Sequence, residues 1–449
     1  MQTLTQTLAH YAASTSIKRI PAEARERAKL IILDEMASAH FGRRSLAGDL
    51  AARYANSLGG PQESLILGTR TRVSAQYAAF ANGAAGHGEE VDGAHVVGGH
   101  PGATLVHAAV AIADRQRTSG AELLNAVVLA YDVGTRLVQA CGGKLPFKQR
   151  THLYSDFLYA VGAAVASCRL LGLEPQRHCH AMALVTFQSN ALASLYQEQR
   201  HVSKSLCNGQ FALAGVSAAL MSAMGMEGVE DVLGMPDGLL EAWGTEDGAG
   251  AVTRRLGEDW AIMGANFKFI NAGYPIHAAV EAAMALQAAH HIDVASIEAV
   301  QIGMPENAMR IVDGRDMHAI CMQDMVSAAL VRGGLSLRES PFPAILSDAH
   351  YARLRPLVQL GIDPDLNREQ PNGRGSHVHI TTQDGRRVSR RVDAPRGHAL
   401  REAVSWSDLA DKWRDGLPDC NVEKMIALAS RLEQLEDVHV LTEVFTSTA

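Results

Sequence analysis

The stretch Ile297-Glu-Ala-Val-Gln-Ile-Gly-Met304 alternates apolar residues with small or polar ones, as a half-buried β-strand does. Further along the chain, residues 377–382 and 386–392 are rich in β-branched side chains and flank the turn Gln383-Asp384-Gly385. This arrangement is typical of a β-hairpin, because Asp-Gly favours the tight turn that joins two antiparallel strands. Together with an expected helix at 275–290, these strands predict a smaller α/β domain over residues 266–395.

On both sides of this region the sequence has the texture of helices. Residues 22–41 carry apolar side chains at helical spacing, with Pro21 before them and Gly42 after them. Similar patterns occur at 46–58, 74–82, 103–116, 120–140, 157–171, 179–194, 204–224, 236–243, 406–414 and 422–435. We therefore predict a mainly α protein in which a large all-helical domain, over residues 1–265 and 396–449, is interrupted by the α/β domain.

Length and composition narrow the function. The chain has 449 residues, a net charge of −7 and 47% hydrophobic residues, which indicates a folded protein of about two domains. It has no long basic run, which disfavours a dedicated nucleic-acid partner. The six cysteines form no CxxC pair, the start lacks a secretory pattern, and the apolar stretch 211–226 is shorter than a bilayer span needs. We expect a cytoplasmic protein with no membrane partner.

One glycine-rich segment concentrates reactive side chains. Residues 82–102 contain seven glycines beside His87, Glu90, Asp92, His95 and His100. The glycines predict a loop whose backbone can approach a ligand closely. Three interpretations stay open from the residues alone: a metal site, an acid–base site in which a carboxylate holds a histidine, and a solvated polar loop.

Two further segments are basic and precede expected helices. Lys268 lies before the helix expected at Pro275, and Lys204 lies at the head of the helix expected at 204–224. A lysine near a helix N-terminus favours an anionic ligand, because the ammonium and the unpaired N–H groups both attract negative charge. Each segment alone is also compatible with an ordinary protein surface.

The order of these motifs resembles the MmgE/PrpD family, which includes 2-methylcitrate dehydratase, cis-aconitate decarboxylase and iminodisuccinate epimerase. The resemblance rests on Asn-Gly-x-x-x-His and His-Pro-Gly before an Ala-rich helix, on Gly162-Ala-Ala-Val-Ala-Ser-Cys-Arg-Leu-Leu-Gly-Leu, on Lys204-Ser-Leu-x-x-Gly, and on Lys268 followed by Tyr274-Pro275 and His277. It implies a homodimer whose subunits have a basic pocket between a helical and an α/β domain, with no metal and no organic cofactor.

The resemblance also implies roles for individual residues. His100 matches the catalytic histidine, Lys204 and Lys268 match two pocket lysines, and Glu90 replaces an aspartate. The remaining positions carried over as substrate-binding are Asp92, His95, His152, Tyr274, His277 and Asp324. The chain departs from the family pattern at Cys207, Gly273 and Asp324, which predicts a substrate other than methylcitrate or cis-aconitate.

These residues predict a cofactor-independent lyase, a dehydratase or decarboxylase, that removes a proton next to a carboxylate of a small di- or tricarboxylate. Two alternatives remain at this point. One is an epimerase or isomerase of an aminodicarboxylate that uses the same carbanion chemistry. The other is a catalytically silent homologue that only binds such a ligand.

Overall fold

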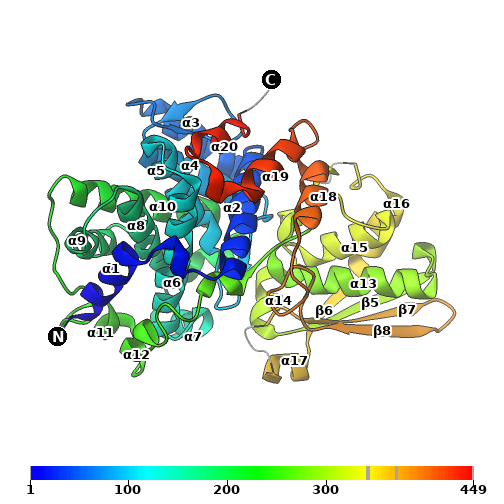
Figure 1. Cartoon of the computed structure of the whole chain (residues 1–449). Coiled ribbons are helices and arrows are strands. Elements are labelled where there is room, and N and C mark those ends of the chain that lie inside the picture. The colour runs from blue at the N-terminus through cyan, green and yellow to red at the C-terminus, as the bar shows by residue number, and fades with distance from the viewer. Residues whose placement is uncertain (1, 340–343, 370–372, 447–449) are drawn as a thin grey trace.

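The computed structural model describes residues 2–339, 344–369 and 373–446, and it has two parts (Figure 1). The larger part is helical. Its N-terminal helices are α1 (Leu4–Ser14), α2 (Ala22–Gly42), α3 (Leu46–Ser57), α4 (Ala75–Gly88), α5 (Pro101–Gln116), α6 (Gly120–Ala140), α7 (Lys144–Thr151), α8 (Tyr159–Leu170), α9 (Pro175–Thr186), α10 (Val202–Ala223), α11 (Leu239–Trp243) and α12 (Gly248–Thr253). The fold class is mainly α with a small α/β part, as predicted.

The smaller part is built on a four-stranded sheet with the order β6-β5-β7-β8. Its strands are β5 (Ile297–Met304), β6 (Val358–Ile362), β7 (Ser376–Thr382) and β8 (Arg387–Val392), and its helices are α13 (His277–His290), α14 (Glu306–Val312), α15 (Met322–Arg332), α16 (Ala349–Leu354) and α17 (Pro364–Glu369). β5 pairs with β6 in parallel and with β7 in antiparallel orientation. β7 and β8 form the expected hairpin, whose turn contains Gly385 with φ +82°.

The alternation seen in the sequence corresponds to the two faces of this sheet. Ile297, Val300, Ile302 and Met304 of β5 are buried, and they pack with α13 and α15 in a second hydrophobic core. This core is separate from the one that fills the helical part. The chain thus has two cores, because one face of the sheet and the helices above it bury each other's apolar side chains.

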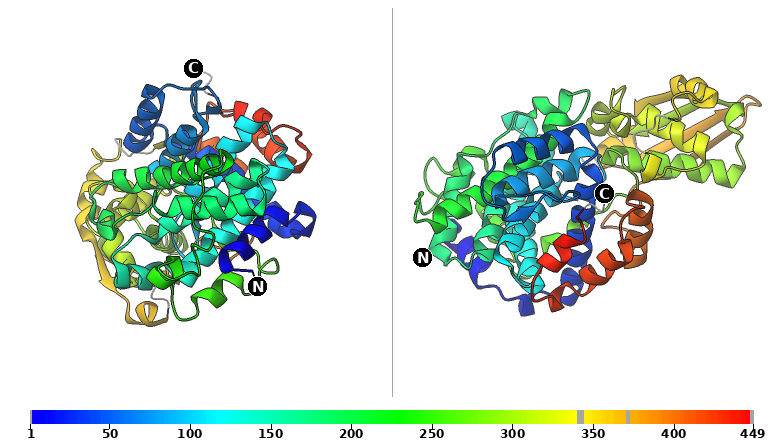
Figure 2. Two further views of the ribbon diagram at one scale, coloured as in Figure 1. Left: turned by 90° about the vertical axis from the view of Figure 1, so that its left-hand side faces the viewer. Right: turned by 90° about the horizontal axis from the view of Figure 1, so that it is seen from above.

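The C-terminal helices α18 (Trp406–Gly416), α19 (Val422–Ser430) and α20 (His439–Glu443) return to the helical part. Figure 2 shows them in orange and red beside the blue N-terminal segment, away from the sheet. Lys412 on α18 donates to Asp34 Oδ1 of α2 at 2.7 Å, and the Trp413 indole N–H donates to the same oxygen at 2.9 Å. Both ends of the chain therefore share one core.

The structure corrects one sequence expectation about helix length. Residues 82–88, predicted to be loop, form the last two turns of α4. The glycines there serve helix packing: a β-carbon on Gly83 would lie 3.0 Å from the α-carbon of Gly209 on α10, and one on Gly209 would lie 2.3 Å from the carbonyl oxygen of Phe80. The two helices can approach this closely only because both positions lack a side chain.

Other predicted helices exist with shifted ends. α9 begins at Pro175, four residues earlier than expected, because proline is well suited to the first turn of a helix, and it ends at Thr186. α10 has 22 residues and is long and apolar enough to cross a bilayer by length and composition alone. Its buried residues, however, pack against α4, α5, α8 and α9 as part of the helical core.

Candidate active site

The segment between α4 and α5 lies where the two parts of the molecule meet. Within it, β3 (Ala94–His95) pairs in antiparallel orientation with β4 (Ala265–Asn266), which leads the chain into the α/β part. This pairing brings Lys268 under the segment that carries Glu90 and Asp92. Gly99, with φ +85°, allows a tight approach, since a β-carbon there would lie 2.5 Å from Asp156 Oδ1. Sequence positions more than 160 residues apart therefore form one cluster.

Glu90 is the centre of this cluster. It is 1% exposed and has a left-handed backbone with φ +54°, which is unusual for a residue with a side chain. Its Oε1 accepts from His201 Nδ1 at 2.6 Å and from Lys204 Nζ at 3.1 Å, and its Oε2 accepts from Lys268 Nζ at 3.1 Å. Burial favours the neutral acid, but the charges of His87, Lys204 and Lys268 outweigh it and hold the pKa of Glu90 well below its usual range.

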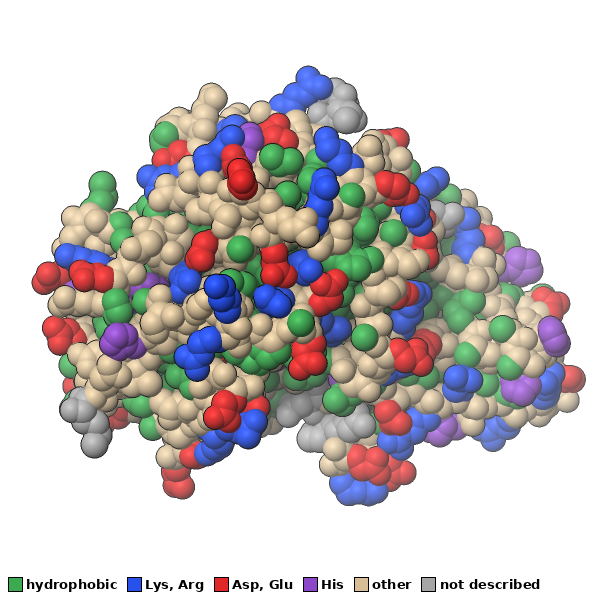
Figure 3. All heavy atoms as spheres, in the orientation of Figure 1, with side chains coloured by type: hydrophobic (Ala, Val, Ile, Leu, Met, Phe, Trp, Pro, Cys, Tyr) green, Lys and Arg blue, Asp and Glu red, His purple; other side chains and the backbone are tan. Residues whose placement is uncertain are grey.

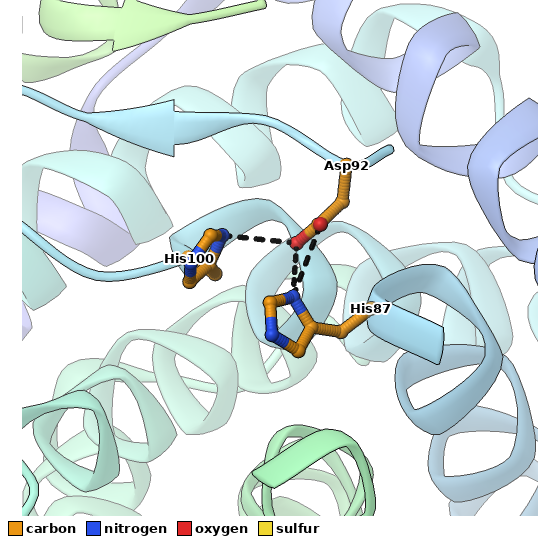
Figure 4. Close-up of side chains that lie close together, drawn as sticks. All are labelled: His87, Asp92 and His100. Carbon is orange, nitrogen blue, oxygen red and sulfur yellow. Dashed lines mark hydrogen bonds and ion pairs between the residues drawn. The ribbon is translucent and has the colours of Figure 1, made fainter. Parts of the chain in front are cut away.

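Asp92 links two histidines, as Figure 4 shows. Its Oδ2 lies 2.9 Å from His87 Nδ1 and 3.2 Å from His100 Nδ1, and its Oδ1 accepts from Lys268 at 3.4 Å. Burial opposes charge on Asp92, yet His87 and Lys268 lower its pKa well below the usual value. Burial likewise lowers the pKa of His87, but Asp92 and Glu90 outweigh it and raise that pKa, so His87 carries a positive charge at neutral pH.

His100, in contrast, is neutral. Its Nδ1 lies 2.9 Å from the carbonyl oxygen of Gly93, which can only accept, so the ring proton is on Nδ1. Nε2 then carries a lone pair, and it has no hydrogen-bond partner among the described residues. Burial lowers the pKa of His100 to about 3 despite the nearby Asp92. The His100 backbone N–H donates to Asp156 Oδ2 at 2.9 Å, which fixes the residue at the start of α5.

A cavity of about 1350 Å³ opens in front of His100, and both parts of the molecule line it. The helical part contributes Glu90, His95, His100, His152, His201 and Lys204, among others. The α/β part and its connections contribute Tyr274, Arg310, Arg315, Arg374 and His398, among others. Basic side chains outnumber acidic ones along this lining, although the chain as a whole is acidic and Figure 3 shows both signs of charge interspersed over one outer face.

The structure places most of the sequence-predicted site residues at this cavity. Glu90, His95, His100, His152, Lys204 and Tyr274 line it. His95 is fully engaged, because its Nε2 donates to the Ala261 carbonyl at 2.8 Å and its Nδ1 accepts from the Val97 N–H at 3.2 Å. Lys268 and Asp92 lie directly behind Glu90; Lys268 is fully buried, and its contacts at 3.4 Å or less are with these two acids.

Two predicted substrate-binding residues lie elsewhere. His277 is buried, is not part of the cavity lining, and donates from Nε2 to the Ala272 carbonyl at 3.1 Å. Asp324 begins α15 in the α/β part, where His318 and Arg355 hold its carboxylate. Because Asp324 is already paired with a cation of the chain and lies outside the cavity lining, the structure gives no support for its predicted contact with a cationic substrate group.

Sequence reasoning gave no role to several residues of the site. His87 and His201 stood in segments that the sequence singled out, but their partners Asp92 and Glu90 become visible only in three dimensions. Lys144, Tyr196 and Arg374 also line the cavity, and they come from segments with no motif. Only the meeting of the two domains brings them together, so no local sequence signal could have found them.

Two sets of side chains have donor atoms close enough to hold a metal ion, His87 with Asp92 and His100, and His87 with Glu90 and His201. Their carboxylates already accept from Lys204 and Lys268 at 3.1–3.4 Å. A divalent cation would therefore lie beside two ammonium groups and a charged His87, which is electrostatically unfavourable. The arrangement fits an acid–base cluster better than a metal site.

A helical part built from both chain ends, an inserted α/β part and a buried His–Asp–Lys cluster at their junction define a class of enzyme-like two-domain proteins. Sequence comparison gives the family. Residues 6–250 match the MmgE/PrpD N-terminal domain and residues 271–433 match the MmgE/PrpD C-terminal domain, so the chain belongs to the MmgE/PrpD family.

Named relatives are lyases. The chain is 24% identical over 438 residues to cis-aconitate decarboxylase from Homo sapiens, a match that covers 93% of this chain and 89% of the relative. It is 23% identical to the Mus musculus enzyme of the same name, with coverage of 93% and 88%. A cis-aconitate decarboxylase from Aspergillus terreus is 26% identical over 236 residues, which cover 51% of this chain and 48% of that protein.

Proposed function

We propose that this protein is a cofactor-independent lyase that acts on a small di- or tricarboxylate by removing a proton next to a carboxylate group. The observation that carries the proposal is the state of His100. Its Nδ1–H is held by the Gly93 carbonyl, its ring is neutral, and it lines the cavity beside Lys204. A neutral imidazole with a free lone pair can accept a proton without first losing one.

The chemical step follows from these groups. His100 Nε2 takes the proton, and the C–H electron pair moves into the neighbouring carboxylate, which gains negative charge. Lys204 and the positively charged His87 surround the site where this charge develops, and they stabilise it in a setting from which most water is excluded. The protein thus supplies a base and fixed positive charges, and no further group is required for proton removal.

What leaves next determines the reaction. If a β-hydroxyl leaves with the C–O electron pair and takes up a proton, water is released and the reaction is a dehydration. If the bond to a carboxylate breaks instead, CO₂ leaves and the remaining carbon takes up the proton held by His100. The names of the relatives favour decarboxylation. The departures at Cys207 and Gly273 favour a substrate that differs from cis-aconitate.

A second candidate, epimerisation, is favoured by His201. This residue also lines the cavity, and its Nδ1 donates to Glu90 at 2.6 Å, which leaves Nε2 as the atom with a lone pair. Nε2 of His201 is buried and has no partner within the described chain. Two neutral imidazoles at one cavity are what an epimerase needs to remove a proton on one face and return it on the other.

Proton exchange tests the proposal. We expect purified protein, in D₂O with a chelator, to exchange or consume a substrate C–H of at least one compound from a panel of citrate-like, aconitate-like and aminodicarboxylate acids, followed by proton NMR. His100→Asn should abolish this signal while tricarboxylate binding persists, because the amide keeps a similar shape but is not a base. Absence of exchange, elimination and decarboxylation with every compound, or wild-type turnover by His100→Asn, would refute the proposal.

The panel also separates the two reactions. A lyase releases CO₂ or produces a new C=C bond, which absorbs in the ultraviolet. An epimerase incorporates deuterium at one carbon without either product. In the second case, His201→Asn should slow incorporation from one stereoisomer much more than from the other.

A further inference from the structure

Two tyrosines in the wall of the cavity have unused hydroxyl groups. Tyr196 and Tyr274 are 9% and 7% exposed, both line the cavity, and the hydroxyl oxygen of each is buried without a hydrogen-bond partner in the described parts of the chain. Buried hydroxyls are nearly always paired in folded proteins, because an unpaired one is costly. The pair therefore indicates a ligand group that accepts hydrogen bonds at this position.

Two cations from different parts of the molecule line the same region. Lys144 begins α7 in the helical part, and its ammonium lies 5.4 Å from the centre of the Tyr196 ring. Arg374 precedes β7 in the α/β part and lies near Tyr196 and Tyr274, which both influence its pKa. Burial lowers the pKa of Lys144 to about 8, and Arg374 and Lys204 are among the charges that lower it. Like charges therefore face each other across the cavity.

We propose that Lys144, Tyr196, Tyr274 and Arg374 form a second anion subsite, which binds the substrate carboxylate remote from the carbon that His100 deprotonates. Ammonium and guanidinium groups only donate hydrogen bonds, and the two free phenol groups offer further donors. Such a set suits an anion with several acceptor oxygens, and the planar guanidinium matches a carboxylate in particular. This inference rests on the proposed function and narrows it to acids with carboxylates on at least two separate carbons.

The size of the cavity agrees with this division into two subsites. About 1350 Å³ is far more than one carboxylate fills, and the lining combines Lys204 and His100 with the second cation pair. An anion between Lys144 and Arg374 offsets their mutual repulsion and connects the two parts of the molecule. Affinity should accordingly depend on residues from both parts.

Calorimetric titration at pH 7 tests the subsite with propane-1,2,3-tricarboxylate as the probe and butyrate as a ligand with a single carboxylate. Arg374→Met should weaken tricarboxylate binding at least tenfold, and the isosteric Tyr196→Phe several-fold, while butyrate binding changes little. Lys424→Met removes an exposed charge on α19, outside the cavity, and should leave both affinities unchanged. Unchanged tricarboxylate binding in Arg374→Met and Tyr196→Phe, or equal losses for butyrate, would overturn the proposal.

Two further arms complete the test. Inorganic phosphate that binds more tightly than the tricarboxylate and loses affinity in the same variants would assign the subsite to phosphate and overturn the carboxylate assignment. Because Lys144 is protonated below its pKa of about 8, tricarboxylate affinity should fall as the pH rises through 8, and Lys144→Met should remove this dependence. Unfolding midpoints of all variants confirm that each is folded.

Failure of the subsite and failure of the proposed function look different. If only the subsite is wrong, wild-type protein still exchanges a substrate proton, and the variants bind the tricarboxylate normally. If only the lyase proposal is wrong, no exchange occurs, but the variants still lose tricarboxylate affinity relative to wild type. His100→Asn, which should bind the tricarboxylate like wild type, links the two measurements.

Discussion

At the scale of residues, the cluster depends on charges that are buried together. Glu90 and Asp92 remain ionised because His87, Lys204 and Lys268 supply positive charge within 3.4 Å of their oxygens. His100 lies beside the same acids and is nevertheless neutral, since a carbonyl oxygen takes its proton and burial opposes its charge. Environment, rather than residue type, divides the two histidines into a fixed cation and a base.

Lys268→Met tests this balance. The substitution keeps the length of the side chain and removes its charge, so two buried carboxylates lose a partner. We expect unfolding free energy at pH 7 to fall by about 3–5 kcal/mol, the usual cost of breaking a buried ion pair on one side. Denaturant unfolding measures the change, with the exposed Lys424→Met as the control.

The pH dependence of this loss has a defined sign. The pKa values of Glu90 and Asp92 are lowered in the folded protein, so their contribution to stability is present above their unfolded pKa values near 4 and is lost as pH falls through the folded values. Without Lys268 those folded pKa values rise. The difference between wild type and Lys268→Met should therefore shrink on acidification, and a difference that grows below pH 5 would contradict the assignment.

The sequence predicted much of this site and missed its organisation. His100, Glu90, Lys204 and Tyr274 were identified from their motifs, and the structure places them at one cavity. The role of His87 as a buried cation could not be predicted, because it depends on Asp92 and Glu90 on both sides of its ring. Asp324 shows the opposite error, since its partner Arg355 is 31 residues away and could not be recognised in advance.

At the scale of elements, helix α10 positions the site by close packing. Lys204 lies in its first turn, and Gly209 lies little more than one turn further on, against α4. The helix periodicity was readable from the sequence, but the role of the glycines was not. Glycine is common both in loops and at close helix contacts, and only the contact across to Gly83 shows which applies.

Gly209→Ala should separate these helices. Its β-carbon would lie 2.3 Å from the Phe80 carbonyl oxygen and 3.0 Å from the Ala84 nitrogen, both of which are backbone atoms that cannot move alone. We expect a loss of about 1–3 kcal/mol in stability, as for other overpacked cores, and reduced turnover through displacement of Lys204. Gly361→Ala in β6 is the matched control, because nothing lies within 4 Å of its added β-carbon. Equal effects of the two substitutions would contradict this account.

At the scale of the whole molecule, the site requires the chain to close on itself. The texture of the sequence indicated a helical domain interrupted by an α/β insert, and the two observed hydrophobic cores follow that division. The cavity between the two parts could not be predicted, since periodicity reports which face of an element is buried and not which domain faces it. The residues that the sequence missed at the cavity, such as Lys144 and Arg374, come from this meeting of domains.

The C-terminal segment supports the site from behind. Lys412 is buried, and besides Asp34 its ammonium donates to the carbonyl oxygen of Val91 at 3.2 Å, next to Asp92 in the chain. Burial lowers the pKa of Lys412 and raises that of Asp34, while their mutual attraction opposes both shifts. A contact between helices α2 and α18, from opposite ends of the sequence, thus holds the segment that carries the catalytic acids.

A double-mutant cycle measures this connection. Lys412→Met leaves the Asp34 carboxylate buried without its cation and should cost about 3–5 kcal/mol in stability, together with turnover, because Val91 loses its anchor. Asp34→Asn alone leaves the lysine unpaired, whereas the combined variant has neither charge and its amide oxygen can still accept from the Trp413 indole. We therefore expect the combined variant to be more stable than Lys412→Met, with a coupling of about 1–3 kcal/mol in denaturant unfolding. Strictly additive losses would mean that the two chain ends are held together by apolar packing alone, and that this ion pair does not position the site.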